Sequence, residues 1–377
     1  MPGGTGLNSQ EIEMTARSLS ATEQARITEG LEAFLKTRLP DAGNLHISAF
    51  SSPGGGLGFS NVTCFFDLDW QAPDGQPRKR RLVLRCPPRS EPLFPDYCLA
   101  KQFRIPVELK AHSIPVPEPL WLEEDPAIIG TPFFLMERLD GAVLPDMPSY
   151  HTAGPYYDAS PDIREKMWFG LVDVMARIHN IDWKSLDMDV LVTARDGRHG
   201  TELQLDYWEN YLAWLKAAAG YPFPVLESAL AWLRGNLYVP EYLALCWGDA
   251  RVGNVLYGAD CSVAGVLDWE MAFFGDPEAD LAWCLFLDWE TWGGAGIDPL
   301  PGHPGKEATI RRYEAQTGRK VKNLFFNEVL AGFKHGLIMA TIFRRPEMTR
   351  LLPTGVDPNE LALNNIASLR LKSLLNL

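Results

Sequence analysis

One segment about two thirds of the way along this chain of 377 residues constrains it more than any other. The segment reads CWGDARVGN over residues 246–254. Two short apolar runs follow, Val255 to Tyr257 and Val263 to Leu267, with Gly258-Ala259-Asp260 between them. Short apolar runs bounded by such residues are typical of two strands joined by a turn. The sequence therefore predicts a polar loop that leads directly into a hairpin.

This hairpin brings an amide and a carboxylate together. If its strands pair antiparallel about the turn, Asn254 lies opposite Leu267 and next to Asp268. Amide and carboxylate oxygens are hard ligands that suit Mg²⁺ bound to phosphates. Asp249, at the start of the loop, can accept a proton from a hydroxyl group. A base Asp followed by a metal-binding Asn and a metal-binding Asp is the layout of a kinase active site, although each residue alone could be a turn former.

Composition excludes several other classes of protein. The formal net charge of −13 argues against binding to nucleic acid or to an anionic membrane surface. The six cysteines contain no C-x-x-C pair and the seven histidines no H-E-x-x-H motif, so neither a zinc site nor a disulfide framework is indicated. No apolar run approaches membrane-spanning length and the N-terminus is polar. We expect a cytoplasmic protein, monomeric or homodimeric, without membrane or nucleic-acid partners.

The first third of the chain is rich in predicted strands. After a capping box at 20–23 and an amphipathic helix, strands are expected at 45–50, 61–70 and 81–85 as an antiparallel meander. A glycine-rich stretch at 53–60 lies between the first two. Glycines let backbone N–H groups approach phosphates, but a flexible hairpin loop has the same composition.

The remainder is mainly helical, so the predicted fold class is α+β and bilobal. The expected N-terminal lobe is 1–139, with a hinge near 136–140, and the C-terminal lobe is 140–377. Pro106 should kink the helix predicted at 97–111 or delay its start. The other elements are a strand at 132–137 and helices from 167, at 202–218, 226–237, from Asp276-Pro277, at 306–316, 323–344 and 358–375.

The sequence resembles the aminoglycoside phosphotransferase and choline kinase-like group, relatives of protein kinases. The resemblance runs from about Phe50 to Trp283 and is most specific in WGDARVGN at 247–254, VLDWE at 266–270 and GDPEADLA at 275–282. It implies a bilobal protein-kinase-like fold, a small-molecule hydroxyl as phosphate acceptor, and ATP or GTP with Mg²⁺ as cofactors.

The resemblance also implies roles for residues of the loop and hairpin. Asp249 would be the base that orients and deprotonates the acceptor hydroxyl, and Asn254 and Asp268 would bind Mg²⁺. Arg251 would face the transferred phosphate, although a structural ion pair is the alternative. Whether Glu270 joins the metal site is left open.

Further positions match the nucleotide-binding parts of the group. They are Gly58, Phe59, Ser60 and Asn61 in the phosphate-covering loop, Arg85 on the third strand, and Met136, Glu137 and Leu139 at the adenine-binding hinge. His179 and Asp280 are expected to brace the catalytic loop by hydrogen bonds. The sequence departs from the group in having Arg85 for a lysine, Gln102 for its glutamate partner, and Trp247 for a histidine.

The leading interpretation is an ATP- and Mg²⁺-dependent O-phosphotransferase. Its acceptor could be an aminoglycoside, for which Asp206 and Glu209 offer acidic groups, a hydroxyacyl-CoA, or another alcohol. The aromatic residues at 207, 208, 211 and 214 could line the acceptor pocket or pack in the core. The alternative function, motivated by Arg85 and Gln102, is a nucleotide-binding pseudokinase or regulatory module without transfer activity.

Overall fold

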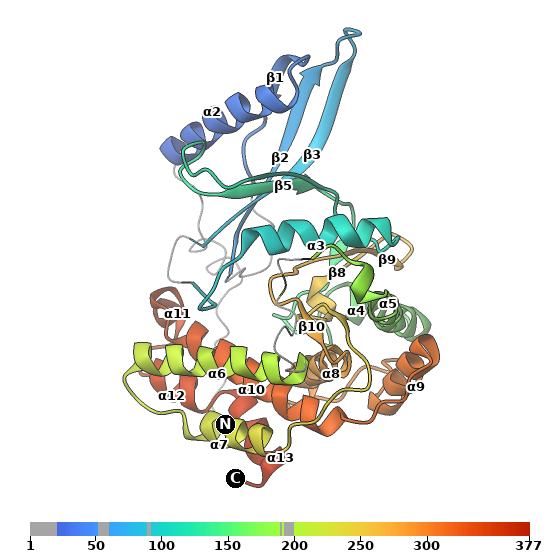
Figure 1. Cartoon of the computed structure of the whole chain (residues 1–377), viewed down its shortest axis with the longest axis vertical. Helices are drawn as coiled ribbons and strands as arrows, with labels where there is room; N and C mark the ends of the chain where they lie inside the picture. Colours follow the sequence, from blue (N-terminus) through green and yellow to red (C-terminus); the bar gives the residue numbers. More distant parts are fainter. Residues whose placement is uncertain (1–20, 52–59, 89–91, 189–190, 192–199) are drawn as a thin grey trace. The chain divides into compact units, whose positions relative to one another are not determined.

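The computed structural model describes residues 21–51, 60–88, 92–188, 191 and 200–377. The chain forms two compact units (Figure 1). Unit 1 comprises the chain up to Pro92 together with Pro117–Leu139, and unit 2 comprises Leu93–Val116 and Asp140–Leu377. Unit 1 is built around a sheet, and unit 2 is mainly helical, as the α+β prediction requires.

Unit 1 contains a five-stranded antiparallel sheet in the order β1-β2-β3-β5-β4. The strands are β1 (Gly43–Ile47), β2 (Val62–Gln71), β3 (Pro77–Cys86), β4 (Pro119–Glu123) and β5 (Phe133–Glu137), and helix α2 (Ala21–Arg38) precedes them. Strand β2 buries Cys64, Phe66 and Leu68, at every second position, because side chains of a strand alternate between its two faces. These side chains share a core with α2, whose Leu31 and Leu35 are completely buried. The predicted meander is confirmed.

Unit 2 surrounds its longest apolar helix, α10, with other helices. Helix α10 packs against α6, α7, α8, α12 and α13 (Figure 1). The helices are α3 (Leu99–Ala111), α4 (Pro155–Asp158), α5 (Pro161–His179), α6 (Gly200–Ala219), α7 (Pro224–Gly235), α8 (Glu278–Trp292), α9 (Lys306–Thr317), α10 (Leu324–Phe343), α11 (Pro346–Leu351), α12 (Pro358–Leu363) and α13 (Ile366–Leu375).

Two small antiparallel sheets lie within unit 2. One pairs β7 (Ala244–Cys246) with β10 (Phe273–Gly275), and the other has the order β6-β8-β9. The second sheet consists of β6 (Ala142–Val143), β8 (Val255–Tyr257) and β9 (Val263–Val266). Strands β8 and β9 are the hairpin predicted from the sequence.

Helix α3 changes the expected division of the chain. We expected one contiguous N-terminal lobe up to residue 139, whereas Leu93–Val116 clusters with unit 2. The cause is packing, because Ile105 and Leu109 belong to the same apolar core as Met175 of α5. Pro106 lies inside α3, which begins at Leu99, so the proline does not delay the start of the helix.

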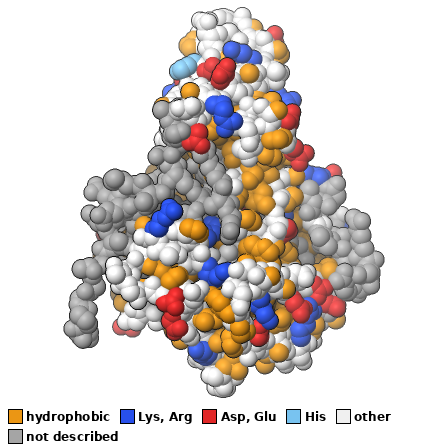
Figure 2. All heavy atoms as spheres, turned by 90° about the vertical axis from the view of Figure 1, so that its left-hand side faces the viewer, with side chains coloured by type: hydrophobic (Ala, Val, Ile, Leu, Met, Phe, Trp, Pro, Cys, Tyr) orange, Lys and Arg blue, Asp and Glu red, His pale blue; other side chains and the backbone are white. Residues whose placement is uncertain are grey.

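The described surface carries charges of both signs. On the face shown in Figure 2, basic and acidic side chains are interspersed, and apolar side chains are exposed among them. Within the described ranges, no helix combines the length and apolarity needed to cross a bilayer.

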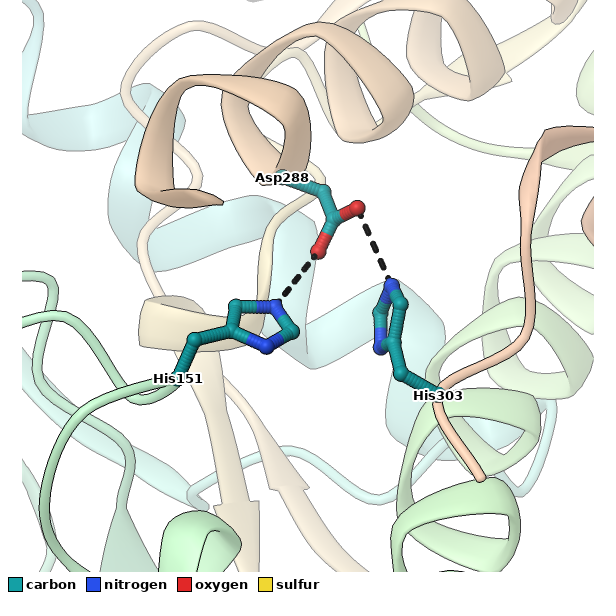
Figure 3. A group of neighbouring side chains, drawn as sticks. All are labelled: His151, Asp288 and His303. Atoms are coloured by element: carbon teal, nitrogen blue, oxygen red, sulfur yellow. Dashed lines mark hydrogen bonds and ion pairs between the residues drawn. The ribbon is translucent and has the colours of Figure 1, made fainter. Parts of the chain in front are cut away.

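A buried carboxylate joins distant segments of unit 2 (Figure 3). Asp288 of α8 is 7% exposed, and its Oδ atoms accept hydrogen bonds from the Tyr150 hydroxyl at 2.6 Å and Trp292 Nε1 at 3.0 Å. The Nε2 atoms of His303 and His151 lie 3.1 Å and 3.5 Å from the same carboxylate. Burial alone would raise the pKa of Asp288, but the His303 charge and the hydrogen bonds hold it well below its usual value.

Asp288→Asn should therefore destabilise unit 2. Replacing a charged acceptor that serves several buried donors costs about 2–4 kcal/mol, which corresponds to a melting temperature lower by about 5 °C or more. Because the folded-state pKa is depressed, the stabilisation is present above the ordinary Asp pKa of about 3.9 and is lost as the pH falls below it. Thermal melts followed by circular dichroism at pH 7 and below pH 4 test this, since the difference from wild type should shrink in acid.

Asp298→Asn is the matched control for this change. Asp298 is exposed and lies in the segment that follows α8, so the melting temperature of the Asp298→Asn variant should equal that of wild type. Equal melting temperatures for the two variants would show that the Asp288 network does not stabilise the fold.

Candidate active site

The loop that carries Asp249 begins with a tight turn at Gly248. The chain leaves β7 at Cys246, and Gly248 has a φ of +85°. A Cβ atom at this position would collide with the Met271 carbonyl oxygen, so both the conformation and the close approach require glycine. A short 3₁₀ turn, Val252–Asn254, then leads into β8.

Asp280 of α8 holds this turn from behind. Its Oδ2 atom accepts hydrogen bonds from Trp247 N at 2.6 Å and His179 Nε2 at 3.0 Å, and its Oδ1 atom accepts one from Gly248 N at 2.8 Å. The Tyr313 hydroxyl lies 2.7 Å from His179 Nδ1 and fixes the ring from the other side. Asp280 is completely buried. The structure confirms the prediction that His179 and Asp280 brace the loop.

Three side chains hold the Asp249 carboxylate. Its Oδ2 atom accepts hydrogen bonds from Asn254 Nδ2 at 2.6 Å and Arg251 Nε at 3.1 Å. Its Oδ1 atom accepts one from Trp283 Nε1 at 2.7 Å. Burial alone would raise the pKa of Asp249, but the charge of Arg251 and these hydrogen bonds lower it below its usual value. The side chain is 16% exposed, so an ionised carboxylate of fixed orientation remains accessible.

Arg251 forms the ion pair that the sequence analysis gave as its alternative role. Its guanidinium binds both Asp249 and Asp146, and these two carboxylates raise its pKa although burial alone would lower it. Its side chain is 27% exposed. The structure thus places a permanent positive charge beside the proposed base.

The hairpin has the register that the sequence predicted. Val255 pairs with Val266, and Leu267 N donates to Asn254 O at 2.9 Å. Asn254 therefore lies opposite Leu267, the residue that precedes Asp268. Asp268 has a φ of +63°, a left-handed conformation that a non-glycine residue adopts at a cost. Trp247 Nε1 stabilises it by donating to the Leu267 and Asp268 carbonyl oxygens at 2.8 Å and 3.1 Å.

These residues provide suitable donors for a hard cation. Asn254 uses its Nδ2 atom to bind the Asp249 carbonyl and carboxylate, which leaves its Oδ1 atom as the one able to bind a metal. Together with the Asp268 carboxylate it would supply oxygen donors of the kind that Mg²⁺ prefers.

Two other groups in the described residues contain potential metal ligands, His179–Cys246–Asp280 and His151–Asp288–His303. Protein groups already occupy the carboxylates of both. Asp280 binds two backbone N–H groups, and Asp288 binds Tyr150 and Trp292. We interpret both groups as structural hydrogen-bond networks.

The predicted nucleotide-binding residues of unit 1 lie on and beside its sheet. Ser60 and Asn61 are buried just before β2, and Asn61 Nδ2 donates to Ser60 Oγ at 3.2 Å. Arg85 is half-buried on β3, opposite Phe134 of β5. Gly58 and Phe59 lie outside the described residues.

The predicted hinge coincides with the end of β5. Met136 and Glu137 are its last residues, and Leu139 follows. The Glu137 N–H group donates to the Glu118 carbonyl oxygen at 2.9 Å, so within unit 1 this backbone donor already has a protein partner.

Some aromatic residues of α6 pack in the core, and others could line an acceptor pocket. Trp208 and Tyr211 are buried, and the Tyr211 hydroxyl donates to Leu93 O at 2.5 Å, which indicates core packing. Tyr207 and Trp214 are half-buried and remain candidates for an acceptor pocket. Asp206 and Glu209 both bind Arg234 of α7, so their charge is compensated within the protein.

Sequence reasoning missed two side chains behind the catalytic loop, Trp283 and Lys334. Trp283 binds the proposed base, but nothing in its local sequence distinguishes it from a core tryptophan. Lys334 did leave a signal, because it is a lysine in the middle of the apolar stretch that forms α10.

A sequence model of the phosphotransferase enzyme family matches residues 58–304, which is more than half of the chain. The chain belongs to this family. The expected bilobal kinase-like fold also agrees with solved structures. A structure from Ralstonia eutropha, provisionally assigned as an aminoglycoside phosphotransferase, has a TM-score of 0.66 and 21% identity, and covers 93% of this chain and 98% of its own.

Two more solved structures have the same fold. The ethanolamine kinase of Plasmodium vivax has a TM-score of 0.57 and 13% identity over 99% of this chain and 95% of its own. An aminoglycoside phosphotransferase in complex with GDP and kanamycin has a TM-score of 0.55 and 16% identity over 91% and 97%. Family and fold together identify the chain as a small-molecule kinase.

The chain is also similar to a longer protein. The rat (Rattus norvegicus) acyl-CoA dehydrogenase family member 11 is 28% identical over 351 residues, which are 89% of this chain and 42% of that protein. The kinase therefore spans less than half the length of this relative.

Asp280→Asn should disorder the catalytic loop and destabilise the kinase. The carboxylate now accepts hydrogen bonds from three donors, and the amide N–H group would face one of these donors. The expected loss in free energy of unfolding is about 2–4 kcal/mol. Thermal melts measure the stability, and the exposed carboxylate-to-amide change Glu307→Gln on α9 is the control, with an expected melting temperature equal to wild type. A wild-type melting temperature for Asp280→Asn would contradict the brace.

Proposed function

We propose that this kinase transfers the γ-phosphate of ATP, with Mg²⁺, to a hydroxyl group of a small molecule. The observation that carries the proposal is the Asp249 carboxylate, which three donors keep ionised beside the hairpin that aligns Asn254 with Asp268. The arrangement supplies the base and the metal donors of a phosphoryl transfer from one continuous stretch of unit 2.

In this proposal each residue of unit 2 has a separate task. Asp249 accepts a hydrogen bond from the acceptor hydroxyl and takes its proton as the new O–P bond forms, while the bond from the γ-phosphorus to the bridging oxygen breaks and ADP leaves. Asn254 Oδ1 and the Asp268 carboxylate would hold Mg²⁺, which would neutralise phosphate charge when bound. Arg251 offsets the charge that develops on the transferred phosphoryl group. Catalysis requires positioning and charge stabilisation, and the protein forms no covalent intermediate.

We assign the nucleotide contacts of unit 1 to the residues predicted from the sequence. Backbone groups at Met136, Glu137 and Leu139 would contact the base. Arg85 would bind a phosphate, because a guanidinium is a bidentate phosphate donor and can replace the lysine usual in the family.

For the acceptor we favour a hydroxyacyl thioester of coenzyme A. The support is the similarity over 89% of this chain to a protein named for acyl-CoA dehydrogenases. The case for an aminoglycoside is weaker than the sequence suggested, because Arg234 compensates the acids Asp206 and Glu209. A CoA acceptor would bring phosphates that require basic residues. Lys216, a basic residue of α6, is paired with Glu227 at 2.5 Å, so other residues would have to bind these phosphates.

Asp249→Asn should abolish transfer and leave nucleotide binding near normal, because the base does not hold the nucleotide. We expect a loss of turnover of at least about a hundredfold. The measurement is release of ADP from ATP, or of GDP from GTP, with Mg²⁺ and a panel of hydroxyacyl-CoAs, aminoglycosides, choline-like alcohols and phenolic alcohols. Full turnover by Asp249→Asn on an acceptor that stimulates the wild type would show that the base is misassigned.

Asp268→Ala should weaken Mg²⁺-dependent ATP binding as well as transfer, because it removes a metal-binding carboxylate. Isothermal titration with ATP in the presence of Mg²⁺ and of EDTA separates the metal-dependent part. Unchanged Mg²⁺-dependent affinity in Asp268→Ala would exclude this residue as a ligand. ATP binding without transfer to any acceptor would favour the pseudokinase alternative.

A further inference from the structure

Helix α10 carries a lysine into the interior of unit 2, directly behind the catalytic loop. Lys334 is 2% exposed. Its Nζ atom lies 3.4 Å from the carbonyl oxygen of Gly248, the residue before the proposed base. Lysine is almost never this deeply buried without a specific partner, so the position calls for a physical explanation.

Three aromatic rings surround the ammonium group. Nζ lies 4.5 Å from the ring centroid of Trp283, 5.3 Å from that of Trp208 and 5.8 Å from that of Phe273. Aromatic faces attract a cation electrostatically, and more strongly where water is excluded. In the described part of the chain no carboxylate forms a salt bridge with Lys334, so the rings and the Gly248 carbonyl are what hold its charge in place.

Two of these contacts lead to the proposed base. Trp283 faces Lys334 with its ring and donates its N–H group to Asp249 Oδ1. Both backbone polar groups of Gly248 are hydrogen-bonded, because Asp280 accepts its N–H group and Lys334 donates to its carbonyl oxygen. A cation over an indole face also draws electron density from the ring and makes the N–H group a stronger donor.

We propose that Lys334 is a positioning residue for phosphoryl transfer, whose positive charge fixes the Gly248 peptide and the Trp283 indole against the base Asp249. This inference rests on the proposed function of Asp249. Lys334 does not touch the reacting groups, and it acts through the loop and the tryptophan. It is the cationic counterpart, on α10, of the Asp280 carboxylate on α8.

The energetic balance supports a functional role over a purely structural one. Burial lowers the pKa of Lys334 to about 8, against the attraction of the Asp280 and Asp249 carboxylates. Burial raises the pKa of the Cys246 thiol well above its usual value, which keeps that group neutral. The charged lysine is therefore less favourable in the folded protein than in water, so its charge costs stability at pH 7.

Three variants separate these roles. Lys334→Met removes the charge and keeps the apolar stem, Lys334→Arg keeps a charge at all relevant pH values, and Val329→Ala loosens the packing of the same helix without a change of charge. We expect Lys334→Met to melt no lower than wild type, and Val329→Ala to melt lower. A purely structural lysine would give a lower melting temperature for Lys334→Met as well.

The kinetic test is the pH profile of turnover, measured as Mg·ATP hydrolysis without acceptor and as transfer to the acceptor found in the panel, each after subtraction of the Asp249→Asn rate. Wild-type turnover should fall as the pH rises through about 8, because Lys334 then loses its proton. Lys334→Arg should move this fall to higher pH. Lys334→Met should be about tenfold or more slower at pH 7 and lack the fall, and Val329→Ala should keep the wild-type profile.

A measurement independent of activity keeps this inference distinct from the proposed function. The Trp283 indole N–H resonance, assigned by its loss in Trp283→Phe, should titrate with a midpoint near pH 8 in wild type and should not titrate there in Lys334→Met. If the resonance does not titrate, or if Lys334→Met retains the wild-type turnover profile, the inference is wrong. If the resonance titrates but no Asp249-dependent turnover exists, the proposed function fails and the coupling of Lys334 to Trp283 stands.

Discussion

The hydrogen bonds of one buried carboxylate determine the geometry of the catalytic loop. Asp280 accepts the consecutive backbone N–H groups of Trp247 and Gly248 on its two oxygen atoms, and this fixes the two peptide groups that lead into the turn before Asp249. Unsatisfied N–H groups inside a protein are costly, so the loop cannot leave this conformation without exposing both of them to an apolar interior. The glycine conformation at 248 and the contact of Trp283 with the base depend on this anchor.

Charge around the site is balanced locally, although the chain as a whole is acidic. Asp249 and Asp280 are two carboxylates within one buried region, and like charges repel each other strongly where water is excluded. The charge of Arg251 lowers the pKa of Asp249, and the charges of Asp280 and Asp249 attract the buried ammonium group of Lys334. The net charge of −13 therefore says little about the field at the proposed base.

The sequence predicted what local patterns determine. The register of the hairpin follows from two apolar runs about a turn, and the placement of Asn254 before Asp268 follows from the register. Packing between distant segments could not be predicted in the same way. Nothing local shows that α3 joins the core of unit 2, or that Arg234 neutralises acids 25 and 28 residues away. Lys334 was missed as well, although a lysine inside the apolar stretch that forms α10 is a local signal of a specific environment.

Trp247, one of the departures from the family pattern, ties the catalytic loop to the hairpin. Its indole N–H group binds the carbonyl oxygens of Leu267 and Asp268, and its ring stacks on Trp269 with centroids 5.7 Å apart. These contacts hold the left-handed backbone of Asp268, the proposed metal ligand, against the start of the catalytic loop. A histidine would make a smaller ring contact and would change its charge near neutral pH. A tryptophan at this position thus ties the loop to the hairpin through a donor that does not titrate, which leaves Asp249, Arg251 and Lys334 to set the electrostatics of the site.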